Sequence, residues 1–336
     1  MASPASDLRL EDLSLWVSQT IGVADAKLER ASEDASFRRY FRIRREAQSW
    51  IAMDAPPEVE DCRPFVHVAQ LMHAAGVHVP EVMAQDIPRG FLLLSDLGTT
   101  TYRSALDEHS ADALFGDAIE ALVKWQVASR PDVLPPYDAA LINRELELFP
   151  DWYMGRHLGL PPNPAQRAML DRIFRLLTDA ALAQPKVYVH RDYMPRNLMV
   201  CTPNPGVLDF QDAVYGPITY DVVSLFRDAF LSWPEERVLD WSIKYWERAR
   251  KAALPVLSDF GAFYRDFEWM GLQRHLKVLG IFARIHYRDG KAGYLDDTPR
   301  FLNYARVAAS RYSALGPLVE LLDTLGEEGP RVAYSF

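Results

Sequence analysis

The sequence predicts an α+β protein with two lobes, a small antiparallel sheet followed by a larger and mainly helical part. Short apolar segments separated by polar turns fill the first hundred residues, as expected for neighbouring strands. Long stretches with apolar residues at helical spacing occupy most of the chain beyond Ser110. The 336 residues suffice for about two lobes at roughly 150 residues each, and we place them at residues 1–98 and 99–336.

The first lobe is expected to begin with a helix, because apolar residues recur at helical spacing from Leu8 to Ile21 and Gly22 follows them. A second helix is expected over residues 64–75, with Pro64 in its first turn. The expected strands cover residues 27–31, 37–44, 49–54, 81–86 and 91–95. The lobe then ends near the segment Ser95-Asp96-Leu97-Gly98.

The second lobe is expected to be helical over residues 111–128, 143–157, 164–183 and most of 234–307. The exception is the stretch 186–210, where brief apolar runs alternate with polar loops. A turn rich in proline, Thr202-Pro203-Asn204-Pro205-Gly206, separates the last two runs and predicts one small hairpin among the helices.

Composition and charge narrow the classes of partner. The net charge of −9 disfavours a nucleic-acid or anionic-membrane binder, so a small molecule is the expected partner, and no obligatory protein partner is indicated. The two cysteines, Cys62 and Cys201, lie far apart without metal-ligand spacing, which fits a reducing compartment. Neither a signal segment nor about 18 consecutive apolar residues occur, so a cytoplasmic protein is expected.

The residues that indicate a chemistry lie in the stretch 186–211. The loop His190-Arg191-Asp192-Tyr193-Met194-Pro195-Arg196-Asn197 is followed, after a strand and a turn, by Asp209-Phe210-Gln211. Carboxylate and amide oxygens at the ends of short strands suit magnesium and a polyphosphate. The order matches the kinase motifs His-Arg-Asp-x-x-x-x-Asn and Asp-Phe-Gly, except that Gln211 replaces the glycine. The alternative is that these polar residues only cap strands and loops.

With these motifs the chain resembles the aminoglycoside phosphotransferase and choline kinase family of small-molecule kinases, over roughly residues 8–310. Within that family it is most similar to the bacterial amino-sugar kinases of peptidoglycan recycling, in residues 32–41, 53–57, 62–66, 90–98 and 273–280. The resemblance implies a bilobal protein-kinase-like fold with ATP and Mg²⁺ as cofactors. It also implies phosphorylation of the anomeric hydroxyl of N-acetylmuramate and N-acetylglucosamine.

The resemblance also implies roles for the motif residues. Asp192 accepts or orients the proton of the substrate hydroxyl, while Asn197 and Asp209 hold magnesium against the nucleotide phosphates. Further candidates are Asp212, for metal-bound water or sugar, and Arg196, for phosphate, although a loop-bracing or surface role is as well founded for both. We expect His190 to brace the loop and Asp221 to cap its backbone amides.

The nucleotide site departs from the kinase pattern. The linking segment with Ser95, Asp96 and Leu97 can offer main-chain groups to an adenine edge. The loop 32–36 has no glycine, so hydroxyls of Ser32 and Ser36 are the candidates for covering the phosphates. Aligned on Val-Ala-Ile-Lys, Asp54 stands where the phosphate-pairing lysine belongs. Either Asp54 points elsewhere or another cation compensates, because a carboxylate repels phosphate.

Arg39 is the candidate for that compensating cation. Alternation along residues 37–44 puts Phe37, Arg39, Phe41 and Ile43 on one face of the strand. If this apolar face is turned toward the nucleotide, Arg39 is turned toward it too. The alternative is that all the arginines of the strand form a solvated edge.

The resemblance places the sugar pocket on helices of the second lobe. The candidates for it are Glu145, Trp152, Tyr153, Tyr215, Arg274, His275, Lys277 and Arg284. Arg274, with Lys277 behind it, is the expected partner of the lactyl carboxylate of N-acetylmuramate, because a bidentate arginine suits a carboxylate. The alternative is that the aromatic residues belong to the core.

Two other functions stay open. One is a kinase of an aminoglycoside, choline or another amino alcohol, whose cationic substrate an acidic protein can accommodate. The other is a pseudokinase that binds nucleotide without catalysis, which the missing lysine and glycines favour. The presence of Asp192, Asn197 and Asp209 opposes the pseudokinase.

Overall fold

The computed structural model describes residues 7–23, 26–32, 37–228, 230–291 and 293–328. The chain forms two compact units, which we call unit 1 (Met1–Ala121 and Arg196–Asp212) and unit 2 (Leu122–Pro195 and Ala213–Phe336). Unit 1 therefore takes in a segment far along the chain, between residues 196 and 212. The division into functional lobes at residue 98 stays a prediction.

Unit 1 is built on one antiparallel sheet with the strand order β1-β2-β3-β5-β4. Each of the five expected strands is present, and their bounds are β1 Glu29–Ser32, β2 Arg39–Arg45, β3 Gln48–Asp54, β4 Val82–Asp86 and β5 Phe91–Ser95. A tight turn joins β2 to β3, with Glu46 in the left-handed region at φ 53°. In the resulting register Arg39 faces Asp54 across the two strands.

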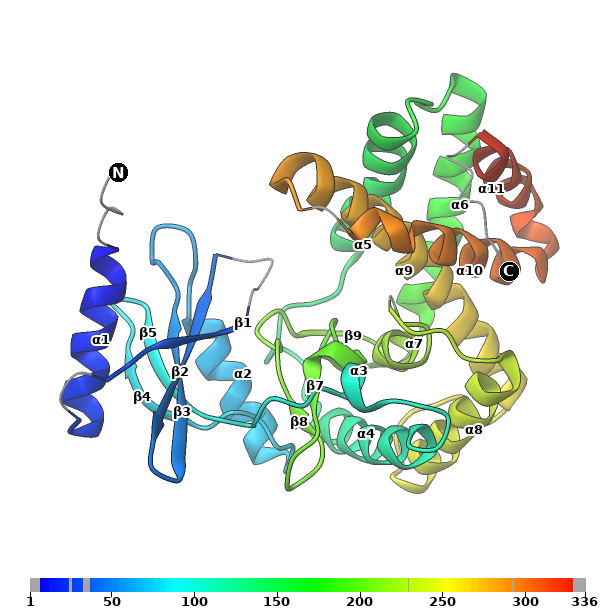
Figure 1. Ribbon diagram of the computed structural model, residues 1–336. Coiled ribbons are helices and arrows are strands. Elements are labelled where there is room, and N and C mark those ends of the chain that lie inside the picture. The colour runs from blue at the N-terminus through cyan, green and yellow to red at the C-terminus, as the bar shows by residue number, and fades with distance from the viewer. Residues whose placement is uncertain (1–6, 24–25, 33–36, 229, 292, 329–336) are drawn as a thin grey trace. The chain divides into compact units, whose positions relative to one another are not determined.

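Helices α1 (Leu8–Ile21) and α2 (Arg63–Ala74) flank this sheet on opposite faces (Figure 1). Asp7 caps the first turn of α1 by accepting from the amide of Leu10, and Gly22 ends the helix at φ 67°. The apolar stripe of α1 packs on the sheet in a core of Leu13, Trp16, Val17, Phe41, Ile43, Ala52, Phe91 and Leu93. The apolar face of β2 is thus covered by α1, which decides the orientation of every side chain on that strand.

A short hairpin, β7 (Leu198–Met199) and β8 (Gly206–Val207), also belongs to unit 1. Isolated bridges join it to His78 and to Thr101, just before the short helix α3 (Tyr102–Ala105). Gly206 permits this close approach, because a Cβ there would lie 2.7 Å from Leu97 Cδ1. The hairpin is thereby fixed beside the segment that follows β5.

Helix α4 (Ala111–Val127) leads from unit 1 into unit 2, which is mainly helical. Its other elements are α5 Ala139–Leu146, η1 Phe149–His157, α6 Pro164–Ala183, α7 Tyr220–Phe226, α8 Glu235–Lys251, α9 Phe260–Asp289, η3 Tyr294–Asp297, α10 Thr298–Ser310, η4 Ser313–Leu315 and α11 Gly316–Glu328, with the strand pair β6 Lys186–Val189 and β9 Val214–Pro217. Over the described residues, no helix combines the length and apolarity that a membrane span requires.

Helix α9 is the centre of unit 2 and contacts α6, α7, α10 and η1 (Figure 1). Every residue from Phe267 to Gly280 is buried, including polar and charged ones. At Gly280 a Cβ would lie 2.3 Å from the backbone of Leu148, so only glycine lets α9 pass so close to the chain before η1. Buried polar side chains are usually hydrogen-bonded, yet Arg274 Nη1 and both ring nitrogens of His275 on this helix have no hydrogen-bond partner among the described residues.

One expectation for this part of the chain was wrong. The single helix expected over residues 143–157 is two elements, because α5 ends at Leu146 and the π-helix η1 begins at Phe149. Pro150 lies in the first turn of η1, where a missing amide hydrogen is tolerated, whereas it would break a continuous α-helix. The hairpin expected around residues 202–206 is present as β7 and β8, whereas the pairing of β6 with β9 was not predicted.

Candidate functional site

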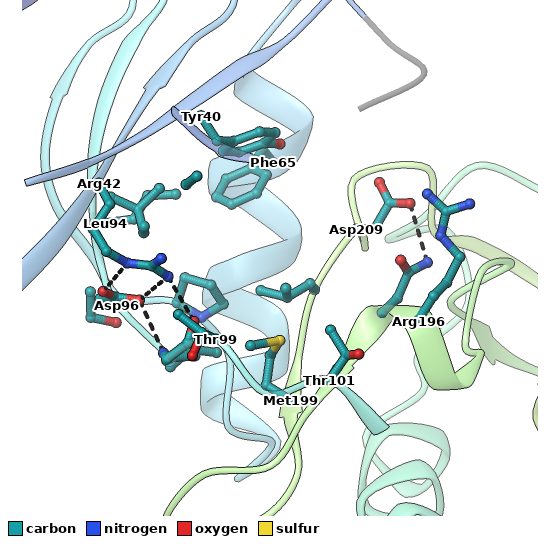
Figure 2. Close-up of a pocket in the computed structure, with 18 residues that line it drawn as sticks. Tyr40, Arg42, Phe65, Leu94, Asp96, Thr99, Thr101, Arg196, Met199 and Asp209 are labelled. Carbon is teal, nitrogen blue, oxygen red and sulfur yellow. Dashed lines mark hydrogen bonds and ion pairs between the residues drawn. The ribbon is translucent and has the colours of Figure 1, made fainter. Parts of the chain in front are cut away.

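A cavity of about 290 Å³ lies within unit 1, between the sheet, α2 and the β7–β8 hairpin. Its walls are apolar at Ile51, Phe65, Leu94, Met199 and Leu208. Arg196 and Asp209 lie at a polar end of the cavity (Figure 2), and Asn197 is hydrogen-bonded to Asp209 there. An apolar slot with a few convergent polar groups is the usual form of a small-molecule site.

The end of β5 and the segment after it form one wall of this pocket, and the predicted nucleotide residues Ser95, Asp96 and Leu97 lie in this wall. The Asp96 carboxylate accepts from Arg42 at 2.7 and 3.0 Å and from the amide of Gly98 at 3.0 Å. Burial raises the pKa of Asp96, but these hydrogen bonds outweigh it and the net shift is downward. Ser95 Oγ accepts from the amide of Glu81 at 2.9 Å. Both side chains therefore hold the shape of the segment, and the contact of its main chain with a nucleotide stays a prediction.

Asn197 and Asp209 meet at the polar end because Asn197 directly precedes β7 and Asp209 follows β8 after one residue. Asn197 Nδ2 donates to Asp209 Oδ2 at 3.3 Å, and Gln211 Nε2 donates to Asp209 Oδ1 at 2.9 Å. Asp209 adopts φ 64°, a left-handed conformation that aspartate tolerates better than most residues. The two motif residues that the sequence singled out as metal ligands are thus neighbours in unit 1.

The donor set of this pair fits magnesium, because Mg²⁺ prefers carboxylate and amide oxygens and needs only one or two from the protein. Within the described ranges no group of three or more His, Cys, Asp or Glu side chains is placed to hold a metal. A metal at Asn197 and Asp209 would therefore take its remaining ligands from water and from a bound phosphate.

Arg39 lies outside the pocket, so the predicted orientation of its strand was wrong. Arg39 Nε donates to the fully buried Asp54 at 2.9 Å, and Arg39 also pairs with Asp7. Arg9 from α1 forms a second ion pair with Asp54. The apolar face of β2 packs on α1, so the opposite face, with Tyr40 and Arg42, lines the pocket. Asp54 therefore points away from the pocket, which was one of the two alternatives for a carboxylate at this position.

We expect Arg39→Ala to lower stability and to leave ATP affinity unchanged. The variant removes one of two cations from a buried carboxylate, which costs about 1–3 kcal/mol in the free energy of unfolding. Urea unfolding and calorimetric titration with ATP measure the two effects. The control is Arg44→Ala, whose ion pair with Glu29 is exposed and contributes about 0–1 kcal/mol. Weaker ATP binding at unchanged stability would indicate instead that Arg39 contacts the nucleotide.

The two serines expected to cover the phosphates are not placed by the structure. Ser36 lies outside the described residues, and of Ser32 only the backbone is described, at the end of β1. Their contacts with a nucleotide stay predictions.

In unit 2 the loop that carries Asp192 is hydrogen-bonded to the side chain of Asp221. The Asp221 carboxylate, in the first turn of α7, accepts from the amides of His190 at 2.6 Å and Arg191 at 3.0 Å, which confirms the predicted cap. Burial raises the pKa of Asp221 to about 7, against the effect of these two hydrogen bonds. His190 Nδ1 accepts from the Asp192 amide at 3.2 Å, which supports its bracing role.

Arg191 extends from the same loop into a buried ion cluster. Glu145 accepts from Arg191 at 2.6 Å, from Lys277 at 2.8 Å and from Tyr137 Oη at 2.6 Å, and Lys277 also donates to Tyr220 Oη at 2.9 Å. Burial acts to raise the pKa of Glu145, but Lys277 and Arg191 outweigh it and lower the pKa to about 2. The structure joins Glu145 and Lys277 to each other and to the loop, so their contact with substrate stays a prediction.

The other predicted sugar residues are spread over unit 2. Tyr153 is buried and stacks on Phe149, and Trp152 is half-buried; both lie on η1 rather than on the helix of Glu145. Tyr215 lies on β9 opposite Tyr188. Arg274 is buried on α9, and its Nη1 has no hydrogen-bond partner among the described residues. These substrate contacts stay predictions. Among the described candidates, Arg274, His275 and Arg284 each have a buried side-chain nitrogen without a hydrogen-bond partner.

Tyr40, Arg42 and Phe65 are pocket residues that the sequence analysis missed. The alternation of β2 did place Tyr40 and Arg42 together on one face. The apolar stripe of α1 distinguishes the two faces of β2, because this helix must pack on an apolar face of the sheet.

Comparisons with known proteins agree with this geometry. The model of the phosphotransferase enzyme family matches residues 27–258. N-acetylmuramate/N-acetylglucosamine kinases from Pseudomonas putida and Pseudomonas aeruginosa are 54% and 52% identical to this chain, each over 96% of it and 98% of the relative. The ADP-bound aminoglycoside phosphotransferase APH(2'')-Ib superposes with a TM-score of 0.60 at 13% identity, over 87% of this chain and 97% of that one. The predicted α+β, kinase-like fold is thereby confirmed.

Proposed function

Because the chain belongs to the phosphotransferase enzyme family, we propose that it transfers the γ-phosphoryl group of ATP to the anomeric hydroxyl of N-acetylmuramate and N-acetylglucosamine. The main support for this proposal is that relatives named for these two sugars share about half of its residues over nearly the whole length. The products would be sugar 1-phosphates for peptidoglycan recycling, made in the cytoplasm, where ATP is available. The partner is then a small molecule.

The pocket of unit 1 supports ATP as the phosphoryl donor. Its apolar walls, at Ile51, Leu94 and Leu208, suit the faces of an adenine ring, and the segment of Ser95, Asp96 and Leu97 offers main-chain groups to the edge of the ring. Asn197 and Asp209 would hold Mg²⁺ at the polar end. When bound, that ion neutralises developing charge on the phosphate groups.

Asp192 is the proposed proton acceptor for the sugar hydroxyl. Phosphoryl transfer needs little covalent help from the protein, so positioning and charge account for most of the rate. Two hydrogen bonds to Asp221 fix the backbone immediately before Asp192, and the ion pair with Glu145 fixes the Arg191 side chain. Arg274 is the proposed partner of the lactyl carboxylate, since it brings an unused donor and a positive charge.

The experiment is an acceptor panel with purified protein, ATP and Mg²⁺. We expect phosphate on N-acetylmuramate and N-acetylglucosamine, none on their 1-O-methyl glycosides, and tolerance of changes at C6, because Asp192 serves only a hydroxyl within hydrogen-bond reach. Phosphorylation of a 1-O-methyl sugar would refute the anomeric assignment, and turnover of choline or an aminoglycoside alone would favour the alternative kinase. Arg274→Ala should harm N-acetylmuramate more than N-acetylglucosamine, which lacks the carboxylate.

A further inference from the structure

The pocket of unit 1 contains no cation from β3, the strand on which kinases carry the lysine that pairs with the nucleotide phosphates. Asp54 aligns with that lysine in sequence, but it is fully buried and is paired with Arg9 and Arg39 on the side of α1. A positive charge facing the phosphates must therefore come from another element, if this protein binds ATP as proposed.

The neighbouring strand β2 carries arginines on its pocket face. Tyr40 and Arg42 both line the pocket, and two-residue alternation puts Arg38 on the same face, one step before the strand begins. Since Arg39 pairs with Asp54 in the β2–β3 register, Arg38 lies beside the end of β3. It is therefore next to the place where the lysine of a kinase would emerge.

The side chain of Arg38 extends toward the metal-ligand candidates. Its Nη2 lies 3.9 Å from Asp209 Oδ1, an ion-pair distance, and only 9% of the side chain is exposed. Arg42 is not equivalent, because it donates to both carboxylate oxygens of Asp96 and to the carbonyl of Gly98 at 2.7 Å. Arg42 is committed to the linking segment, whereas Arg38 brings its charge to the polar end.

We propose that Arg38 takes the role of the missing lysine and binds the phosphate groups of the nucleotide. This inference rests on the proposed function, since it presumes that the pocket binds ATP. The planar guanidinium presents two parallel N–H groups to phosphate oxygens, so an arginine from β2 can replace a lysine from β3. The position of Arg38 beside Asp209 puts this donor where metal and phosphate would meet.

The test compares three ligands, namely ATP, ADP and adenosine, by calorimetric titration with Mg²⁺ and again with EDTA. We expect Arg38→Ala to weaken ATP and ADP binding about 10- to 100-fold under both conditions, as for loss of a charged hydrogen bond, and to leave adenosine binding unchanged. Arg38→Lys should retain most of the affinity. The matched control is Arg44→Ala, on the same strand face but paired with Glu29 at the exposed end, which should bind like the wild type.

Each other outcome overturns the inference. A loss seen only with Mg²⁺ would mean that Arg38 acts through Asp209 and not on phosphate. An equal loss for adenosine would mean a structural role. If the alanine variant does not fold, Arg38→Gln replaces it, because it keeps a polar side chain without the charge. Normal ATP binding by Arg38→Ala with a selective loss in Arg196→Ala would assign the role to Arg196. Failure of the wild-type protein to bind ATP at all would refute the proposed function itself.

Discussion

Asp192→Asn is expected to reduce kcat by about 10²- to 10⁴-fold while ATP affinity stays within a few-fold of the wild type. Asparagine has almost the same shape as aspartate but cannot accept the proton of the sugar hydroxyl. The amides of His190 and Arg191 remain bound to Asp221, so the loop keeps its backbone position in the variant. Initial rates at saturating sugar and calorimetric titration with ATP measure the two quantities.

Asp240→Asn is the control for a simple loss of negative charge. Asp240 forms an exposed ion pair with Lys244 within α8, and its replacement should change neither quantity. Near-normal turnover by Asp192→Asn would contradict its role as proton acceptor. A large loss of ATP affinity would instead indicate that Asp192 acts on the nucleotide side of the reaction.

The positions of the strands and of the first helix along the chain could be predicted because they depend on local patterns. Alternation identified the strand that is β2, and helical spacing with Gly22 identified α1. The direction in which β2 faces could not be predicted from that strand alone, because arginines occur on both of its faces. Packing of Phe41 and Ile43 under α1 decides it, and this is a property of the folded unit.

In the candidate site, too, motif residues could be predicted from the sequence, whereas contacts between distant residues could not. The spacing of Asp192, Asn197 and Asp209 is a sequence motif, so these residues were found directly. The ion pairs of Asp54 and Glu145 join residues separated by up to 132 positions, which no local pattern specifies. The sequence analysis therefore selected Glu145 and Lys277 as functional candidates without predicting that they pair with each other.

We expect the second large effect from replacement of Glu145, because this buried carboxylate is shared by two cations. Glu145→Gln leaves Arg191 and Lys277 as two buried cations without their shared carboxylate, which costs about 3–5 kcal/mol in the free energy of unfolding. Because Arg191 directly precedes Asp192, kcat should fall as well, with less effect on ATP affinity. Urea unfolding and steady-state kinetics measure these changes.

Glu147→Gln is the matched control, since it makes the same substitution two residues further on. Glu147 pairs with Arg167, both side chains are exposed by about a third or more, and loss of this pair costs about 0–1 kcal/mol.

Adding Lys277→Met to Glu145→Gln should then recover part of the lost stability, because it removes one of the two unpaired buried charges. Recovered stability without recovered kcat would show that the cluster positions the loop of Asp192 as well as stabilising unit 2. Equal losses in the two glutamine variants, or additive losses in the double variant, would show instead that the ion cluster fixes neither the fold nor the loop.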